Sequence, residues 1–223
     1  MTSRLVAICF EARRPRELAL FWSELLGWKA SDEDPLLLEA PIPVWFVPTD
    51  EVKLAQNIMH FDLTSESEQG QLRTVERALA LGARHADVGQ KGDEGHVVLA
   101  DPEGNEFCVI EPGNKFLAGC GPVGALACDG SRAVGCFWST ALGWPLVWDQ
   151  DEETAIQSPY GGTKITWGGP PVEPRVGKDL FLAVEVDGPE EVDRLVALGA
   201  SRAGEGVLTD PDGRKFTVRP RYT

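Results

Sequence analysis

The chain has 223 residues, 43% hydrophobic and 25% charged, which is an ordinary composition for a globular protein of one or two domains. Its 35 acidic and 21 basic residues give a formal net charge of −14, which disfavours nucleic acids and anionic membrane surfaces as partners. Apolar runs stay shorter than the roughly 18 residues that a membrane-spanning helix requires, so we expect no membrane insertion.

The first half of the chain is predicted to contain two successive strand–helix–strand cycles. Apolar spacing predicts a helix over Pro15–Leu26, with Pro15 in its first turn and Gly27 at its end. A second helix is predicted over Gln71–Leu81, before Gly82. The predicted strands are Leu5–Phe10, Leu36–Leu38, Val44–Val47, Ile58–Leu63, Val97–Leu99 and Glu106–Ile110. The last two flank a predicted hairpin turn that begins at Asp101.

The second half repeats the first. FWSELLGW at 21–28 returns as FWSTALGW at 137–144, ALGA at 80–83 returns at 197–200, and LADPEGNEF at 99–107 returns as LTDPDGRKF at 208–216. Helices are therefore expected near Arg132–Leu142 and Pro189–Leu198, with a weaker opening strand over Gly121–Cys128. The repeat divides the chain into two expected domains, residues 1–115 and 118–223.

These repeated segments resemble the vicinal oxygen chelate superfamily, which contains the glyoxalase and bleomycin-resistance proteins. The resemblance implies an α+β tandem glyoxalase/bleomycin-resistance fold. Four βαβββ units would form two curled-sheet troughs, with the helices outside. Whether the units pair within a half or across the halves stays open, and a homodimer is compatible with the sequence.

The resemblance also implies four metal-ligand positions in each trough, on the first and last strands of its units. In the first half these positions fall on Ala7, Val47, His60 and Cys108; in the second half they fall on Val123, Gly168, Phe181 and Thr217. A catalytic metal normally takes at least three protein ligands. One His and one Cys fall short of that number, so we expect no metal ion and no cofactor in either trough.

Strand alternation predicts which side chains face the first trough, because successive residues point to opposite faces of a sheet. Val6, Ile8 and Phe10 should face the helices, whereas Cys9, His60, Asp62 and Cys108 should face the trough, together with the ring of Trp45. An aromatic wall beside a few polar groups is typical of a small-molecule site. The second trough, with Val123, Ala125, Phe181, Ala183 and Thr217, should be filled, although Lys215 and Arg219 could hold an anion there.

Two functions remain open. The first is a metal-free protein that binds a planar or aromatic metabolite or drug in the first trough through Trp45, His60, Asp62, Cys9 and Cys108. The alternative is a lyase, isomerase or oxygenase of the same fold that uses His60 as an acid–base group or as the remnant of a metal site. The Asp62 carboxylate should lie about 6–7 Å from His60 along the strand, so direct pairing requires the side chains to bend.

The cysteines and the amino terminus indicate a cytoplasmic protein. The five cysteines are odd in number and contain no CxxC pair, which favours reduced thiols over disulfides or a zinc site. The first residues lack the basic and apolar segments of a secretory signal.

Overall fold

The computed structural model describes residues 3–91, 94–169 and 177–221, which form four βαβββ units. The first unit contains β1 (Arg4–Ala12), α1 (Pro15–Leu26), β2 (Lys29–Ala30), β3 (Leu37–Glu39) and β4 (Val44–Pro48). The second contains β5 (Met59–Leu63), α2 (Glu68–Ala80), β6 (Arg84–His85), β7 (Val97–Ala100) and β8 (Glu106–Val109). The third contains β9 (Val123–Asp129), α3 (Arg132–Leu142), β10 (Leu146–Gln150), β11 (Glu153–Gln157) and β12 (Lys164–Gly168). The fourth contains β13 (Leu180–Val186), α4 (Pro189–Ala197), β14 (Ser201–Gly204), β15 (Val207–Thr209) and β16 (Lys215–Pro220).

The four predicted helices are confirmed, with both ends of α2 shifted and α4 ending at Ala197 rather than Leu198. α1 and α3 have the predicted bounds, and each ends at a glycine in the left-handed conformation, Gly27 with φ 72° and Gly143 with φ 67°. α2 begins at Glu68 rather than Gln71, because the Ser67 side chain accepts a hydrogen bond from the Gly70 N–H and caps the helix earlier. None of the four helices in the described ranges has the length and apolar character needed to cross a bilayer.

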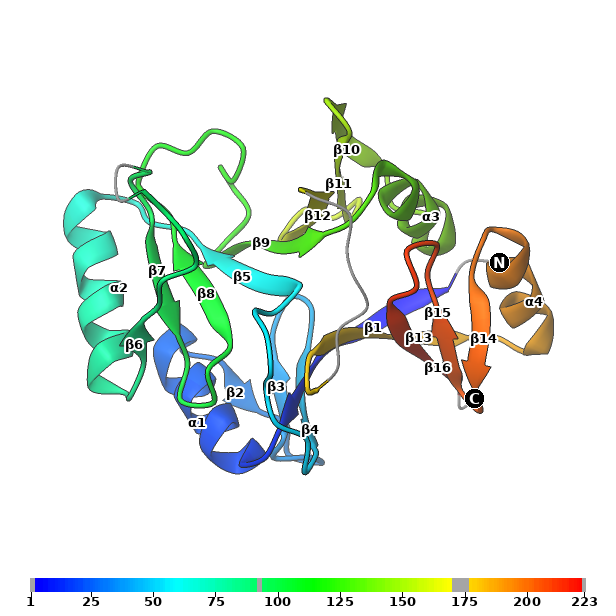
Figure 1. The fold of residues 1–223 in the computed structure, drawn as a ribbon, viewed down its shortest axis with the longest axis horizontal. Coiled ribbons are helices and arrows are strands. Elements are labelled where there is room, and N and C mark those ends of the chain that lie inside the picture. The colour runs from blue at the N-terminus through cyan, green and yellow to red at the C-terminus, as the bar shows by residue number, and fades with distance from the viewer. Residues whose placement is uncertain (1–2, 92–93, 170–176, 222–223) are drawn as a thin grey trace.

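The units pair across the two halves of the chain (Figure 1). Sheet A has the strand order β14-β15-β16-β13-β1-β4-β3-β2 and combines the first unit with the fourth. Sheet B has the order β10-β11-β12-β9-β5-β8-β7-β6 and combines the second unit with the third. The joints are antiparallel, β1 against β13 and β5 against β9. Each trough therefore takes one wall from each half of the chain.

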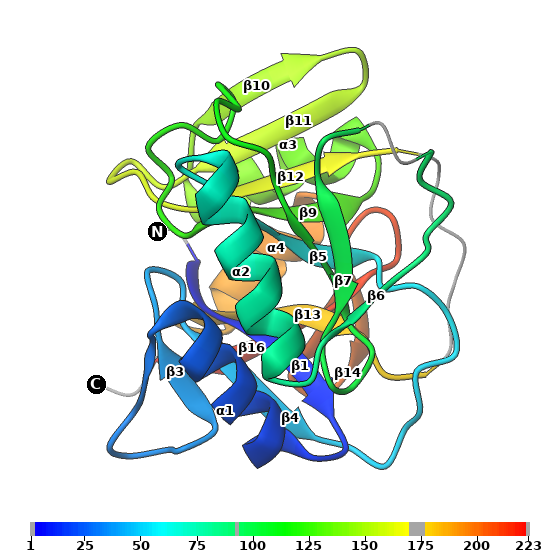
Figure 2. The same ribbon diagram turned by 90° about the vertical axis from the view of Figure 1, so that its left-hand side faces the viewer.

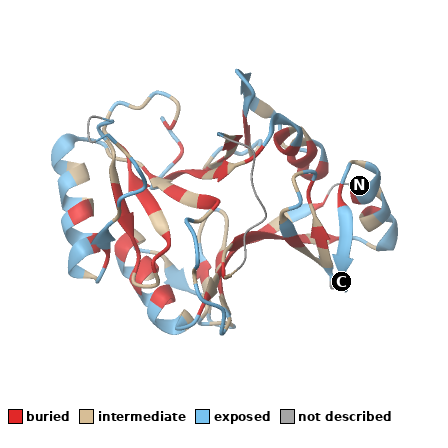
Figure 3. Cartoon of the chain, in the orientation of Figure 1, coloured by how far each residue is buried: buried red, intermediate tan, exposed pale blue. Residues whose placement is uncertain are grey.

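The helices, in contrast, pack within the halves. α1 and α2 lie on the same side of the molecule (Figure 2), and their buried residues face the strands (Figure 3). Trp22 of α1 packs on Phe107 of β8 with 5.0 Å between ring centroids, and Trp138 of α3 packs on Phe216 of β16 at 4.9 Å. Both tryptophans are almost fully buried, so these aromatic contacts hold the two units of each half together.

Two register shifts change the predicted faces of strands. The β1–β13 register slips between Leu5 and Ala7, so Val6 joins the trough-side cluster of Ala7, Cys9 and Phe181 instead of the helix-side core. The β5–β9 register slips between Asp62 and Leu63, and Val123 belongs to the helix-side core. The predictions for Val6 and Val123 were wrong because one extra residue reverses the alternation of a strand.

A turn from the second unit caps the helix of the first. The Glu103 carboxylate accepts hydrogen bonds from the N–H groups of Arg13, at 3.1 Å, and Arg14, at 2.6 Å, where α1 begins without a side-chain cap of its own. The same carboxylate pairs with Lys178, and both side chains are about 96% buried. In the second half, the Asp212 carboxylate accepts from the N–H of Ser131, beside α3, at 2.6 Å.

We expect Glu103→Gln to lower the free energy of unfolding by about 2–4 kcal/mol at pH 7, because it leaves the buried Lys178 ammonium without its counter-charge. Burial raises the pKa of Glu103, but Lys178 and the two N–H donors outweigh it and lower the pKa overall. The carboxylate therefore stabilises the fold above the glutamate pKa of the unfolded chain and loses this effect as the pH falls through the lower pKa of the folded state. Chemical denaturation across pH 3–8 should show the difference between the two proteins shrinking below about pH 4.

The matched control is Glu17→Gln, which removes an exposed acid from the same helix and should change stability by less than about 0.5 kcal/mol. The capping role of Glu103 would be contradicted if both substitutions lowered the free energy of unfolding equally. It would also be contradicted if the loss of stability in Glu103→Gln did not depend on pH.

Candidate functional site

The trough of sheet B holds an open cavity of about 420 Å³ beside His60. His60 and Asp62 of β5 lie opposite Ala127 and Ala125 of β9, and Asp62 lies beside Cys108 of β8. The small Ala127 side chain lines the cavity together with His60. A cavity of this size accommodates a small organic molecule.

The structure brings three predicted site residues into one cluster. The His60 Nε2 and Asp62 Oδ1 atoms are 3.4 Å apart, so the side chains bend toward each other along the strand. Donor atoms of His60, Asp62 and Cys108 all lie within 4.8 Å of one another. His60 is 33% exposed and lines the cavity, whereas Cys108 is buried. His60 is therefore the member of the cluster that a ligand meets first.

The surroundings of His60 favour its protonated form. Burial lowers the pKa of His60, but hydrogen bonds to Asp62 and Cys108, together with electrostatic interactions with both groups, outweigh burial and raise the pKa from 6.5 to about 10. At neutral pH the ring therefore carries a proton on both nitrogens and acts only as a hydrogen-bond donor.

Two aromatic rings that contact each other also line the cavity. Trp148 of β10 keeps 40% of its surface exposed, and its ring meets that of Phe116 edge-on, with 6.0 Å between centroids. Lys164 of β12 donates a hydrogen bond to the Phe116 carbonyl, and its ammonium lies 4.4 Å from the centre of the Phe116 ring. Lys164 thus fixes Phe116 at the cavity.

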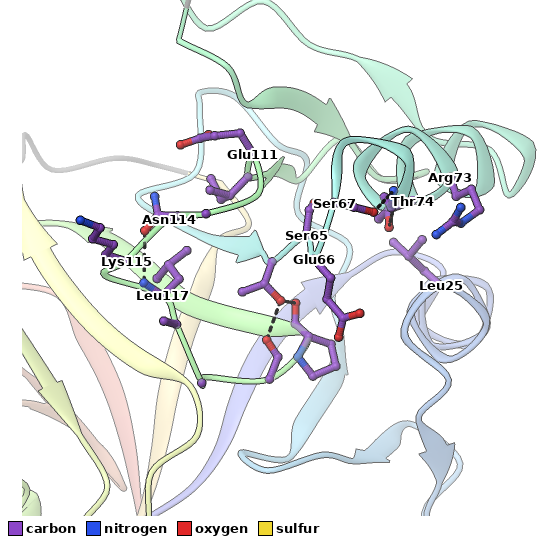
Figure 4. Close-up of a pocket in the computed structure, with 18 of the residues that line it drawn as sticks. Leu25, Ser65, Glu66, Ser67, Arg73, Thr74, Glu111, Asn114, Lys115 and Leu117 are labelled. Carbon is purple, nitrogen blue, oxygen red and sulfur yellow. Dashed lines mark hydrogen bonds between the residues drawn. The ribbon is translucent and has the colours of Figure 1, made fainter.

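The linker segment, residues 111–122, contributes Phe116 to this cavity and several other residues to a larger cavity of about 830 Å³ (Figure 4). Figure 4 shows Arg73 and Thr74 of α2 on one side of the larger cavity and Lys115 and Leu117 of the linker segment on the other. Leu117 also packs in the apolar cluster that contains Cys108. The larger cavity has side chains of both charges and contains none of the predicted site residues.

Trp45 and Cys9 lie in sheet A, away from His60, so the prediction that all five residues share one trough was wrong. The reason is the pairing across halves, which places Trp45 and Cys9 with Phe181 of β13. These residues and their apolar neighbours fill the sheet A trough. Cys9 is fully buried, and burial raises the pKa of its thiol to about 12.

The polar rim of the sheet A trough is occupied by ion pairs. Lys215 pairs with Glu11 and lies 4.8 Å from the centre of the Phe181 ring, and Arg219 pairs with Glu185 at 3.3 Å. The two cations that could have held an anion in this trough therefore have acidic partners of their own.

The two troughs differ in how many side chains could ligate the metal ion that the resemblance implies. In sheet A the implied positions are Ala7, Val47, Phe181 and Thr217, of which the first three have no donor atom. In sheet B the implied positions are His60, Cys108, Val123 and Gly168, and only the first two donate. Asp62, outside the implied pattern, adds a third donor. The four-ligand pattern is thus absent from the described residues of both troughs, but sheet B offers three donors of different chemistry.

Sequence reasoning missed Trp148 and Phe116. Phe116 lies in a segment interpreted only as a boundary, and Trp148 lies just before the acidic residues 149–153. An apolar residue inside a glycine-rich linker was a usable signal, because exposing it to water would cost free energy. Its position over the sheet B trough depends on Lys164, which is 48 residues away.

The chain matches the model of a protein family described as glyoxalase-like domain, over residues 7–110 and again over 124–219. The two matches together span most of the chain. A search of curated protein sequences finds no significant match.

Among solved structures, the fold is similar to that of glyoxalase I from Zea mays, with a TM-score of 0.64 and 14% identity over 97% of this chain and 92% of that chain. It is also similar to a putative dioxygenase from Bacillus subtilis subsp. subtilis str. 168, with a TM-score of 0.56 and 14% identity over 98% of this chain and 85% of that one. At such identities the comparisons concern the fold alone.

We expect Asp62→Asn to lower the pKa of His60 by roughly one to two units, because it removes a negative charge at hydrogen-bond range. An NMR titration of the imidazole resonances measures this shift directly. His85, which is exposed and lies outside the cluster, provides the internal reference resonances. An unchanged His60 pKa would show that the two side chains do not pair.

Proposed function

Because the chain belongs to the glyoxalase-like domain family, which matches both of its halves, we propose that it binds a small planar molecule in the trough of sheet B. The observation that carries this proposal is the cavity of about 420 Å³ that Trp148 and Phe116 line together with His60. The ligand would be a planar or aromatic metabolite or drug.

The chemistry of the cavity supports this class of ligand. An exposed tryptophan ring gains free energy when a flat apolar surface covers it, and the adjoining Phe116 edge extends the contact. The protonated ring of His60 supplies a donor for an acceptor such as a carbonyl oxygen on the ligand. A mostly apolar cleft with few polar groups is the usual design of small-molecule sites.

Binding in this proposal needs no metal ion. Of the four positions that the family resemblance assigns to metal ligands around sheet B, Val123 and Gly168 offer no donor. The polar groups of the cluster would instead orient the ligand through hydrogen bonds.

The test compares ligand affinity among variants, with planar aromatic metabolites as the screened compounds and tryptophan fluorescence as the signal. Trp148→Ala should weaken binding by about 1–3 kcal/mol and reduce the fluorescence change, as expected for a buried aromatic anchor. His60→Gln should weaken binding by about 1–3 kcal/mol through loss of a charged donor.

The control is Trp45→Phe, which alters a tryptophan of the filled sheet A trough and should leave affinity unchanged. If Trp45→Phe weakens binding and Trp148→Ala does not, the ligand site lies in sheet A and the proposal is wrong.

A second function, that of an enzyme, is favoured by one observation: the His60, Asp62 and Cys108 donors lie within 4.8 Å of one another. Such a cluster could transfer a proton through His60. It could also hold one divalent ion through nitrogen, oxygen and sulfur, which together suit zinc. Three protein ligands leave a position for substrate, as in catalytic metal sites.

Elemental analysis of protein prepared without an affinity tag or chelator separates the two functions. For the metal-free binding protein we expect far less than one equivalent of zinc, iron, nickel or manganese per chain. About one equivalent that disappears in both His60→Ala and Asp62→Asn would establish a metal site and favour the enzyme. The variant Cys136→Ala, outside the cluster, is the matched control and should leave metal content unchanged.

A further inference from the structure

A basic cleft of about 680 Å³, here called the Arg84 cleft, lies where the start of α1, the loop at 50–55 and the β7–β8 turn meet. Its basic residues are Arg13, Arg14, Lys53, Arg84 and Lys178, and its acidic residues are Asp50, Glu103 and Glu106. An excess of basic over acidic side chains is unexpected in a chain whose net charge is −14. None of these residues lines the cavity beside His60.

Internal partners already neutralise two of the three acids. Glu103 pairs with Lys178 and accepts from the backbone at the start of α1. Glu106 accepts from Lys53 through both oxygens, at 2.6 and 2.7 Å, and from the Asn57 N–H at 3.0 Å. These carboxylates therefore have little capacity left to balance the remaining cations.

Arg13 and Arg84, both exposed, are in none of the ion pairs found among the residues that the structure describes. The Arg84 guanidinium lies directly over Gly104: a Cβ built there would meet Arg84 Nη2 at 3.2 Å and Lys53 Cδ at 3.7 Å. Two cationic side chains thus share the space above one glycine. The Lys53 ammonium is bound to Glu106, so the Arg84 guanidinium is the cation of this pair without an acidic partner.

We propose that the Arg84 cleft binds a phosphoryl group of a small organic molecule. Arg13 and Arg84 offer two guanidinium groups and Asp50 adds one carboxylate, so the groups of the cleft without an internal ion pair have a net positive charge. A phosphate monoester has three acceptor oxygens and can bind both guanidinium groups at once, whereas a single carboxylate has only two oxygens. Guanidinium groups also bind phosphate oxygens in pairs, which favours them over ammonium groups for this role. Val52 and Leu54, exposed at 44% and 66%, border the cleft and offer apolar contact to the organic part of the ligand.

Inorganic phosphate is the probe for this site, with the full chain and a fixed ionic strength. Isothermal titration should give saturable binding with a dissociation constant of about 1 mM or below. Arg84→Gln and Arg13→Gln should each weaken binding about fivefold or more through loss of a charge-assisted hydrogen bond. Acetate, with one charge, should bind at least about tenfold more weakly than phosphate.

The control variant is Lys29→Gln, which removes an exposed cation on β2, outside the cleft, and should leave phosphate affinity unchanged. Neither arginine substitution strands an acidic partner, so all variants should keep the melting temperature of the parent protein. Non-saturable phosphate binding, equal affinity for acetate, or equal effects of Arg84→Gln and Lys29→Gln would each overturn the proposal.

Discussion

The antiparallel joints between β1 and β13 and between β5 and β9 are the interactions on which the site depends. At each joint, a strand from the first half of the chain pairs with a strand from the second half, which gives one continuous eight-stranded sheet. Backbone hydrogen bonds fix its register, and the register decides which side chains meet across a trough. His60 therefore lies opposite Ala127 of the second half, not beside Trp45 of its own half.

Helix and turn contacts, in contrast to the sheet pairing, join the two units within each half. Trp22 packs on Phe107, and the Glu103 carboxylate caps α1, so the helix of the first unit is held by the second. Trp138 with Phe216 and Asp212 with Ser131 repeat this arrangement in the second half. Sheets that cross the halves and helices that pack within them interlock the four units, since neither set of contacts can open without straining the other.

The same framework carries two troughs with different contents. In sheet A, Phe181 and its apolar neighbours fill the trough, and ion pairs of Lys215 and Arg219 line its rim. In sheet B, Ala127 of β9 and His60 of the polar cluster line an open cavity. Packing makes the apolar cluster of the first trough a part of the protein interior, whereas the second trough has an open cavity beside His60, where we propose that a ligand binds.

The sequence by itself determined the four units, the bounds of α1 and α3, and the faces of most strands. Each of these follows from local periodicity, capping and the internal repeat. It also identified His60, Asp62 and Cys108 as trough residues. Only the tertiary structure decided that the units pair across halves, that Val6 and Val123 change face at register shifts, and that Trp148 and Phe116 border the cavity. These features depend on hydrogen bonds and packing between residues far apart in the chain, which local patterns do not encode.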